Sequence, residues 1–266
     1  MKLQVRHFIV SAVVAIASGS CVPPVLAQPV YEQTPDKFGI TEPSIATSLP
    51  QRGDPFGVRK FLFDHGVSYN VIYTNDVLGN TRGGIRRGTI DQGKFEGQLL
   101  VDLEKLAGWK DWTFYANAFG IYNSGRIRRD YVGGMNTIAA IEATPTVRLS
   151  ELWVERKIFD GAASLRLGQL AADSEFFFSD LAYIFLQGDG PTIGAVNLPG
   201  GGPAYPLSTP GVRLKVDFHK DASFLVAAFN GDPAGPCTGD PDTCNRYGLN
   251  FRLRDPAFLI GELQFR

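Results

Sequence analysis

The chain has few of the residues on which enzymatic catalysis and metal binding most often depend. It contains three histidines and three cysteines among 266 residues. His7 lies in the first 27 residues, and His65 and His219 are far apart in the sequence. A catalytic constellation around histidine is therefore hard to assemble. We expect no enzymatic activity, no cofactor and no metal site.

The chain also lacks an excess of basic charge and long apolar runs. Residues 1–27 hold two of the 26 basic residues and none of the 27 acidic ones, so the remainder carries a net charge of −3. Nucleic-acid-binding surfaces are basic, and we expect no nucleic-acid partner. After residue 27 no run approaches the roughly 18 apolar residues of a membrane-spanning helix.

The first 27 residues have the pattern of a secretory signal peptide. Lys2 and Arg6 precede a short apolar run at 8–17, and the small-residue sequence at 25–27 fits a cleavage site. Lipidation at Cys21 is an alternative, although the usual leucine before the cysteine is missing. We expect export, followed by a periplasmic leader at 28–65.

The leader is rich in Pro, Thr, Ser and Gln and ends in one short predicted helix. Asp54 is its expected N-cap, Pro55 stands at the first position, and Gly66 ends it.

The mature chain then retains Cys237 and Cys244, in a loop-forming segment. An oxidising compartment favours a disulfide between them. Two free thiols or a metal-binding pair are the alternatives.

Period-two alternation of apolar and polar residues predicts nine strands after residue 66. They are expected near 67–74, 89–103, 112–122, 212–218, 223–229, 247–254 and 258–266, with two more in a hairpin within 148–178. Short turns follow the second, fourth, sixth and eighth strands, and longer loops follow the others. This alternation is typical of an outer-membrane barrel. A soluble sandwich, with its apolar face against a second sheet, is the other interpretation.

The hairpin has one apolar and one charged face. Glu151, Trp153 and Glu155 share a face of its first strand, Phe159 to Ala162 form the turn, and Arg166 belongs to the charged face of its second strand. In a barrel the charged face lines a water-filled lumen.

Several segments resemble one known family. They are YTNDVLGN (73–80), DLEKLAGW (102–109), DYVGGMNTIAAIEA (130–143), RLSELWVER (148–156), LRLGQLAADSEFFFSD (165–180), LPGGGPAYPLSTPGVRLKV (198–216) and FNGDPAGP (229–236). In this order they are similar to the outer-membrane carbohydrate-selective porins of the OprB family. The resemblance implies an all-β, antiparallel transmembrane β-barrel of sixteen strands, with short periplasmic turns and long extracellular loops. It also implies passive entry of glucose-like sugars.

Nine predicted strands fall short of sixteen, so we expect residues 66–266 to be a partial barrel, the N-terminal part of such a porin. Expected partners are small sugars and outer-membrane lipid, with a homotrimer by analogy to porins. A secreted, soluble all-β carbohydrate-binding protein is the alternative.

The predicted pore-lining or sugar-binding residues are charged or aromatic. An aromatic face suits the apolar side of a sugar ring, and charged groups bind its hydroxyls. The set comprises Glu151, Trp153, Glu155, Arg166, Asp173, Arg213, Lys215 and Arg252. The structural alternatives are a lipid-facing Trp153, a helix N-cap at Asp173, and basic residues that only keep the wall wet. A glycosidase pair of Glu151 and Glu155 is disfavoured, because four residues along a strand span about 13 Å.

Overall fold

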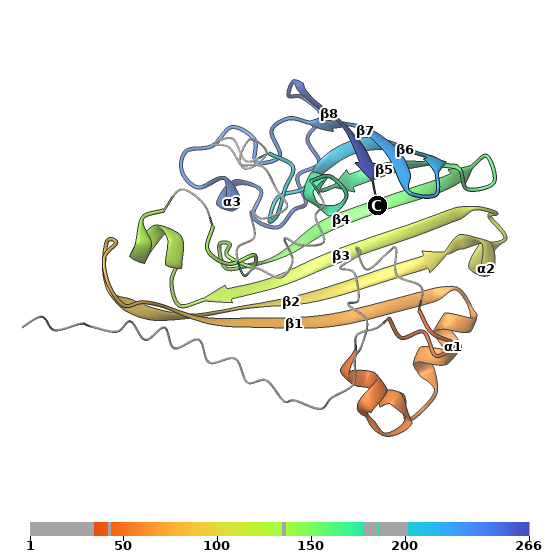
Figure 1. The fold of residues 1–266 in the computed structure, drawn as a ribbon, viewed down its shortest axis with the longest axis horizontal. Helices are drawn as coiled ribbons and strands as arrows, with labels where there is room; N and C mark the ends of the chain where they lie inside the picture. Colours follow the sequence, from red (N-terminus) through yellow and green to blue (C-terminus); the bar gives the residue numbers. More distant parts are fainter. Residues whose placement is uncertain (1–34, 42–43, 135–136, 178–185, 187–201, 266) are drawn as a thin grey trace, which may run out of the picture.

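The computed structural model describes residues 35–41, 44–134, 137–177, 186 and 202–265. The predicted signal peptide and the start of the leader lie outside these residues. Eight strands form one antiparallel sheet in sequence order, shown in Figure 1. They are β1 (Val67–Asn80), β2 (Gly88–Asp102), β3 (Trp112–Asn123), β4 (Thr146–Ile158), β5 (Ala163–Leu170), β6 (Thr209–His219), β7 (Ala222–Asn230) and β8 (Ala257–Phe265).

The helical segments are short and lie between or before the strands. They are η2 (Ile45–Ser48), η3 (Pro50–Gly53), α1 (Val58–Asp64), α2 (Leu103–Ala107), η4 (Ile127–Val132), η5 (Ala172–Ser174) and α3 (Pro241–Cys244). None of the helices in the described part of the chain is long and apolar enough to cross a membrane.

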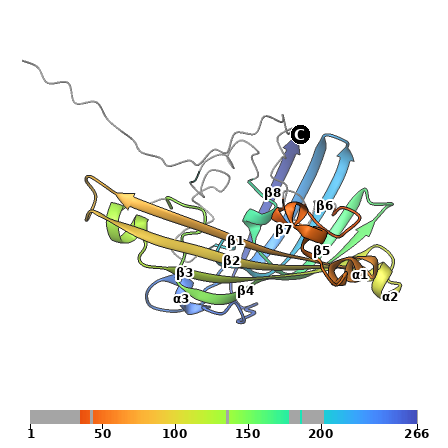
Figure 2. The ribbon, with the colours of Figure 1, turned by 90° about the horizontal axis from the view of Figure 1, so that it is seen from below.

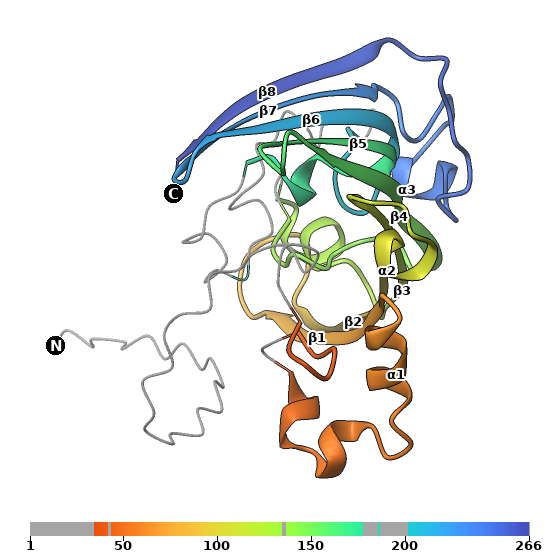
Figure 3. The same ribbon diagram turned by 90° about the vertical axis from the view of Figure 1, so that its right-hand side faces the viewer.

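The sheet curves into an arc that is open on one side (Figures 2 and 3). Its convex face carries exposed apolar side chains, including Val71 on β1, Leu167 on β5 and Leu259 on β8. Its concave face carries a buried hydrophobic cluster whose members include Tyr115 and Trp153. The apolar side therefore points out of the arc, as in a membrane barrel and unlike a soluble sandwich.

Two kinds of connection lie at the two ends of the sheet. Residues 159–162 and 220–221 are tight turns, and residues 103–111 form α2 and a short link. At the other end, the connections at 124–145, 171–208 and 231–256 are long. The first loop, at 81–87, is shorter than the predicted 76–88, because β1 continues to Asn80. The predicted long-short alternation is otherwise present.

The predicted strand at Tyr247–Arg254 is wrong, and eight strands rather than nine are described. Its apolar and polar residues do alternate, but its backbone does not form the hydrogen bonds of a strand in the sheet. The Leu149 N–H donates to the Tyr247 carbonyl (3.0 Å), and the left-handed Gly248 donates to Asn245 (3.0 Å). The segment therefore folds back against β4 beyond the end of β5 instead of joining the sheet.

The helix before β1 is also placed slightly differently from its prediction. Gly57, not Asp54, is the N-cap of α1, and the carboxylate of Asp54 instead accepts the Lys60 N–H at 3.1 Å. The predicted disulfide is confirmed: Cys237 and Cys244 are joined, with 6.0 Å between their Cα atoms.

Candidate functional site

The β4–β5 hairpin builds the wall of the candidate site. It turns on Phe159 and Asp160, both in the left-handed region, and its register sets Glu155 opposite Arg166 and Trp153 opposite Gly168. A side chain at position 168 would collide with the backbone of Leu152 and Trp153. Glycine therefore lets the two strands approach where the tryptophan lies.

A register shift in β4 gathers more polar side chains on the concave face than strict alternation allows. Leu152 pairs with Ala116, but Leu149 pairs with Ala118, so one extra residue is accommodated in β4. Such a bulge resets which residues face inward. Ser150 and Glu151 are adjacent in the sequence and both buried.

Two arginines and two glutamates form a closed charge cluster on this wall. Arg166 Nη2 lies 2.8 Å from Glu155 Oε2, and Arg213 Nη2 lies 2.6 Å from the same oxygen. Glu175 Oε2 is 3.1 Å from Arg166 Nη1, and its Oε1 is 2.6 Å from Arg213 Nη2. Each carboxylate therefore bridges both guanidinium groups, which are only 2% exposed.

Two aromatic rings adjoin the cluster. The Trp153 ring stacks on Tyr115, with centroids 4.9 Å apart and planes 26° apart, and the Arg166 guanidinium lies 3.7 Å from the Trp153 centroid. β3 supplies the tyrosine, which pairs directly with Trp153 in the sheet register. The lipid-facing alternative for Trp153 is therefore wrong, because the side chain is buried on the concave face.

The segment after β5 folds onto the concave face and supplies Glu175. Phe176 is 1% exposed and packs edge-on against Phe229 of β7, with ring centroids 6.4 Å apart. The Phe177 N–H donates to Glu262 of β8 (2.7 Å), and Gln264 donates to the Glu175 carbonyl (2.8 Å). The segment therefore connects β5 to the opposite part of the arc.

Glu151 and Asp173 hold this segment rather than joining the arginine cluster. Glu151 Oε1 accepts the Ala171 N–H (3.3 Å) and the Ser174 hydroxyl (3.1 Å). Asp173 Oδ2 accepts the Tyr205 N–H at 2.8 Å. The alternative role of Asp173 as a helix N-cap is wrong, because Ala171 is the N-cap of η5.

The remaining predicted residues lie outside the cluster. Lys215 follows Arg213 by two residues on β6, and its Nζ lies 3.8 Å from Asp217 Oδ1. Arg252 is not on a strand at all. It lies in the loop before β8, where its Nη2 is 2.7 Å from Asp255 Oδ1, so its predicted place on a strand wall is wrong.

Sequence reasoning did not include Glu175, a member of the charge cluster, or Tyr115, which stacks on Trp153. Glu175 lies two residues after Asp173, in a segment whose inward fold no periodicity shows. Tyr115 falls on the same alternating face of β3 as Asn117, and only the register with β4 brings it onto Trp153. Within the described residues, no group of three or more His, Cys, Asp or Glu side chains is placed to hold a metal ion.

Comparison with known proteins identifies the family. The model of the carbohydrate-selective porin, OprB family, matches residues 86–266. The chain belongs to the OprB family. Porin B of Pseudomonas aeruginosa is 26% identical over 203 residues, covering 71% of this chain and 43% of that protein. A structure of Pseudomonas putida OprB at high pH has a TM-score of 0.67 and 23% identity, over 80% of this chain and 51% of that one.

These comparisons bear on the fold of this chain and on how much of a related porin it spans. The similarity to the solved OprB structure confirms an antiparallel barrel fold for the sheet of this OprB-family chain. The chain spans less than half of Porin B and about half of the solved OprB chain. In barrels of this fold the lumen-facing side is polar and the lipid-facing side apolar, which agrees with the charged concave face and the exposed apolar convex face of this sheet.

Proposed function

We propose that this chain forms the wall of an outer-membrane channel through which sugars diffuse passively into the periplasm, after export directed by residues 1–27. One observation carries the proposal: the Tyr115–Trp153 stack adjoins the Arg166 and Arg213 guanidinium groups on the lumen wall. Charged hydrogen-bonding groups that are held in fixed positions by aromatic packing suit the hydroxyl groups of a sugar.

The segment of residues 171–177 supports a constriction at this level. It places Glu175 and Phe176 against the lumen wall and is bonded to β4, β6 and β8. A segment that narrows a channel beside an aromatic and charged wall selects solutes by size and by hydroxyl contacts. Glucose-like sugars are the proposed substrates. Glu155 and Lys215 keep part of their side chains exposed and are the proposed direct contacts, whereas Trp153, Arg166 and Arg213 are buried and hold Glu155 in position.

Planar bilayer recording tests the proposal. Protein extracted in detergent from the outer-membrane fraction is expected to form ion-conducting channels whose current falls when glucose is added. Channels that conduct equally well at saturating glucose would contradict the sugar site. Recovery of the chain as a stable, detergent-free monomer would contradict the membrane channel and favour the soluble carbohydrate-binding alternative.

The exposed convex face argues against that alternative. Val71 is 70% exposed, Leu167 59% and Leu259 72%, on three different strands. Contiguous apolar patches of this kind are rare on soluble monomers. The homotrimer stays a prediction, and sedimentation of the detergent-solubilised protein measures it.

A further inference from the structure

The residues before β1 expose an unusual number of large apolar side chains. In the N-terminal unit, defined here as residues 35–41 and 44–66, Phe56 is 90% exposed and Ile45 79%. Phe61, Val58 and Leu49 are also exposed. A water-soluble periplasmic appendage would be expected to bury such side chains or replace them with polar ones.

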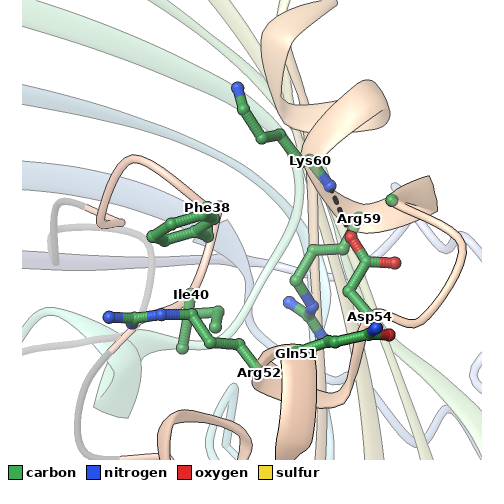
Figure 4. A pocket seen from close by; sticks show the side chains of 8 residues that line it. Phe38, Ile40, Gln51, Arg52, Asp54, Arg59 and Lys60 are labelled. Carbon is green, nitrogen blue, oxygen red and sulfur yellow. Dashed lines mark hydrogen bonds between the residues drawn. The ribbon is translucent and has the colours of Figure 1, made fainter.

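This unit is folded, so it presents those side chains in a fixed direction. The Asp36 carboxylate accepts the Phe38 and Ile40 N–H groups and lies 3.0 Å from Arg52 Nη1. The Arg52 guanidinium lies 4.5 Å from the Phe38 ring centroid. A cavity of about 360 Å³ lies beside them, and Figure 4 shows Phe38, Ile40, Arg52 and Arg59 among the side chains that line it.

Arg59 fixes the unit to the lipid-facing side of β1. Its guanidinium lies 4.2 Å from the Tyr69 ring centroid, and its Nη1 donates to the Tyr69 carbonyl at 2.9 Å. Tyr69 belongs to the same alternating face as the exposed Val71 and Tyr73. In Figure 3 the unit extends away from the interior of the arc, on the convex side of β1.

The unit also lies at the end of the sheet where the short turns are, which in outer-membrane barrels is the periplasmic end. Other exposed aromatic side chains mark this end: Trp109 in the β2–β3 link, Phe159 in the β4–β5 turn and Phe218 at the end of β6. Aromatic residues gather in this way where a barrel meets the membrane interface.

We propose that the N-terminal unit lies in the periplasmic membrane interface, with Phe56 and Phe61 inserted among the lipids. A protein partner could cover one sector of the arc, but the exposed aromatics occur at three turns around it as well as in the unit. The lipid interface contacts all of them. The unit would then anchor the first strand to the membrane, and this role does not depend on sugar passage.

Fluorescence of a bimane label tests the proposal on the whole chain reconstituted in phospholipid vesicles. The label is attached to the variant Phe56→Cys, with Val71→Cys as the lipid-facing control and Arg82→Cys, in the exposed β1–β2 loop at the opposite end of the sheet, as the aqueous control. The unsubstituted chain is labelled in parallel to subtract reaction at other cysteines. All three sites are exposed, so the labels should leave folding intact.

We expect the label at position 56 to be quenched by spin-labelled lipid, as at position 71, and to be protected from aqueous iodide. Quenching by iodide to the extent seen at position 82 would overturn the proposal. Protection from both quenchers would also overturn it, because the label would then be buried against protein. A label at position 71 that lipid does not quench would show instead that the sheet itself is not inserted.

Discussion

Glu175 is the residue on which the position of the inward segment most depends. Its carboxylate bonds both Arg166 and Arg213, and the arginines come from two different strands. A glutamine keeps the shape but not the charge. Loss of one partner of a buried ion pair costs about 3–5 kcal/mol, which here weakens the attachment of residues 171–177 to the wall.

We therefore expect Glu175→Gln to raise the single-channel conductance in the absence of sugar, because the segment leaves the wall more often. Bilayer recording measures this directly. Asp221→Asn, in the exposed β6–β7 turn, is the matched carboxylate-to-amide control and should conduct like the unsubstituted protein. Equal conductance for both variants would show that Glu175 does not hold the segment in place.

Trp153 permits a separate test of the proposed sugar site. Trp153→Leu removes the ring against which the Arg166 guanidinium lies, whereas Trp153→Phe keeps part of it. Because a cation–π contact contributes about 0.5–2 kcal/mol and Arg166 positions Glu155, we expect a roughly two- to tenfold higher glucose concentration for half-block in the leucine variant. The phenylalanine variant should lie between the two. Unchanged glucose block in both variants would place the sugar elsewhere in the lumen.

The disulfide loop is an element held by charge as well as by its covalent bond. Arg126 Nη1 pairs with Asp240, between the two cysteines, and Arg148 Nη2 donates to the Asn245 carbonyl at 2.8 Å. For a separation of seven residues, loop closure contributes about 2–3 kcal/mol. The bond therefore helps to keep this loop on the edge of β4.

Replacing both cysteines, Cys237→Ser with Cys244→Ser, should loosen the contact between this loop and β4. We expect faster hydrogen exchange at the Leu149 N–H, which donates to Tyr247. The N–H groups between β4 and β5 serve as the internal control, because their partners are on the sheet. If the Leu149 amide exchanges at its original rate, the loop is held by its ion pairs and hydrogen bonds alone.

The same loop should respond to pH. Burial raises the pKa of Asp242 above its ordinary value, with a further contribution from the Asp240 charge, and burial also raises the pKa of Glu142 in the β3–β4 connection, whose Arg126 pairs with this loop. The folded loop therefore binds protons more readily than the unfolded chain. Its stability should increase as the pH falls from neutral through these raised pKa values towards the ordinary ones.

Hydrogen exchange of the loop amides, corrected for intrinsic rates between pH 7 and 5, measures this effect. We expect slower corrected exchange at the lower pH. Asp242→Asn, whose side chain cannot ionise, should weaken the pH dependence of the corrected exchange rates. If that pH dependence is unaltered, other titratable groups cause it.

At the scale of the whole molecule, alternation in the sequence predicted the sheet because each strand has one side on the apolar convex face and one on the concave face. It predicted the inward side of Trp153 and Arg166 for the same reason. It failed at Tyr247–Arg254, where alternating residues lie in a loop whose backbone bonds β4. It also missed Glu175, because the position of a segment that folds into a lumen depends on contacts with distant strands.

The two-sidedness of the sheet can be tested within one hairpin. Leu167 is 59% exposed on the convex face at the middle of β5, and Phe159 is 79% exposed in the turn that precedes the strand. Arginine on the lipid face of a barrel costs about 2–4 kcal/mol at the bilayer midplane and about 0–1 kcal/mol near the interface. Leu167→Arg should therefore destabilise the protein much more than Phe159→Arg.

Urea-induced unfolding in phospholipid vesicles gives the two free energies of unfolding under one set of conditions. The same arginine is introduced in both variants, so their difference reports depth in the membrane rather than side-chain chemistry. Equal destabilisation would mean that Leu167 is not at the middle of the lipid. The convex face would then need another covering, and the assignment of the concave face as a lumen would lose its main support.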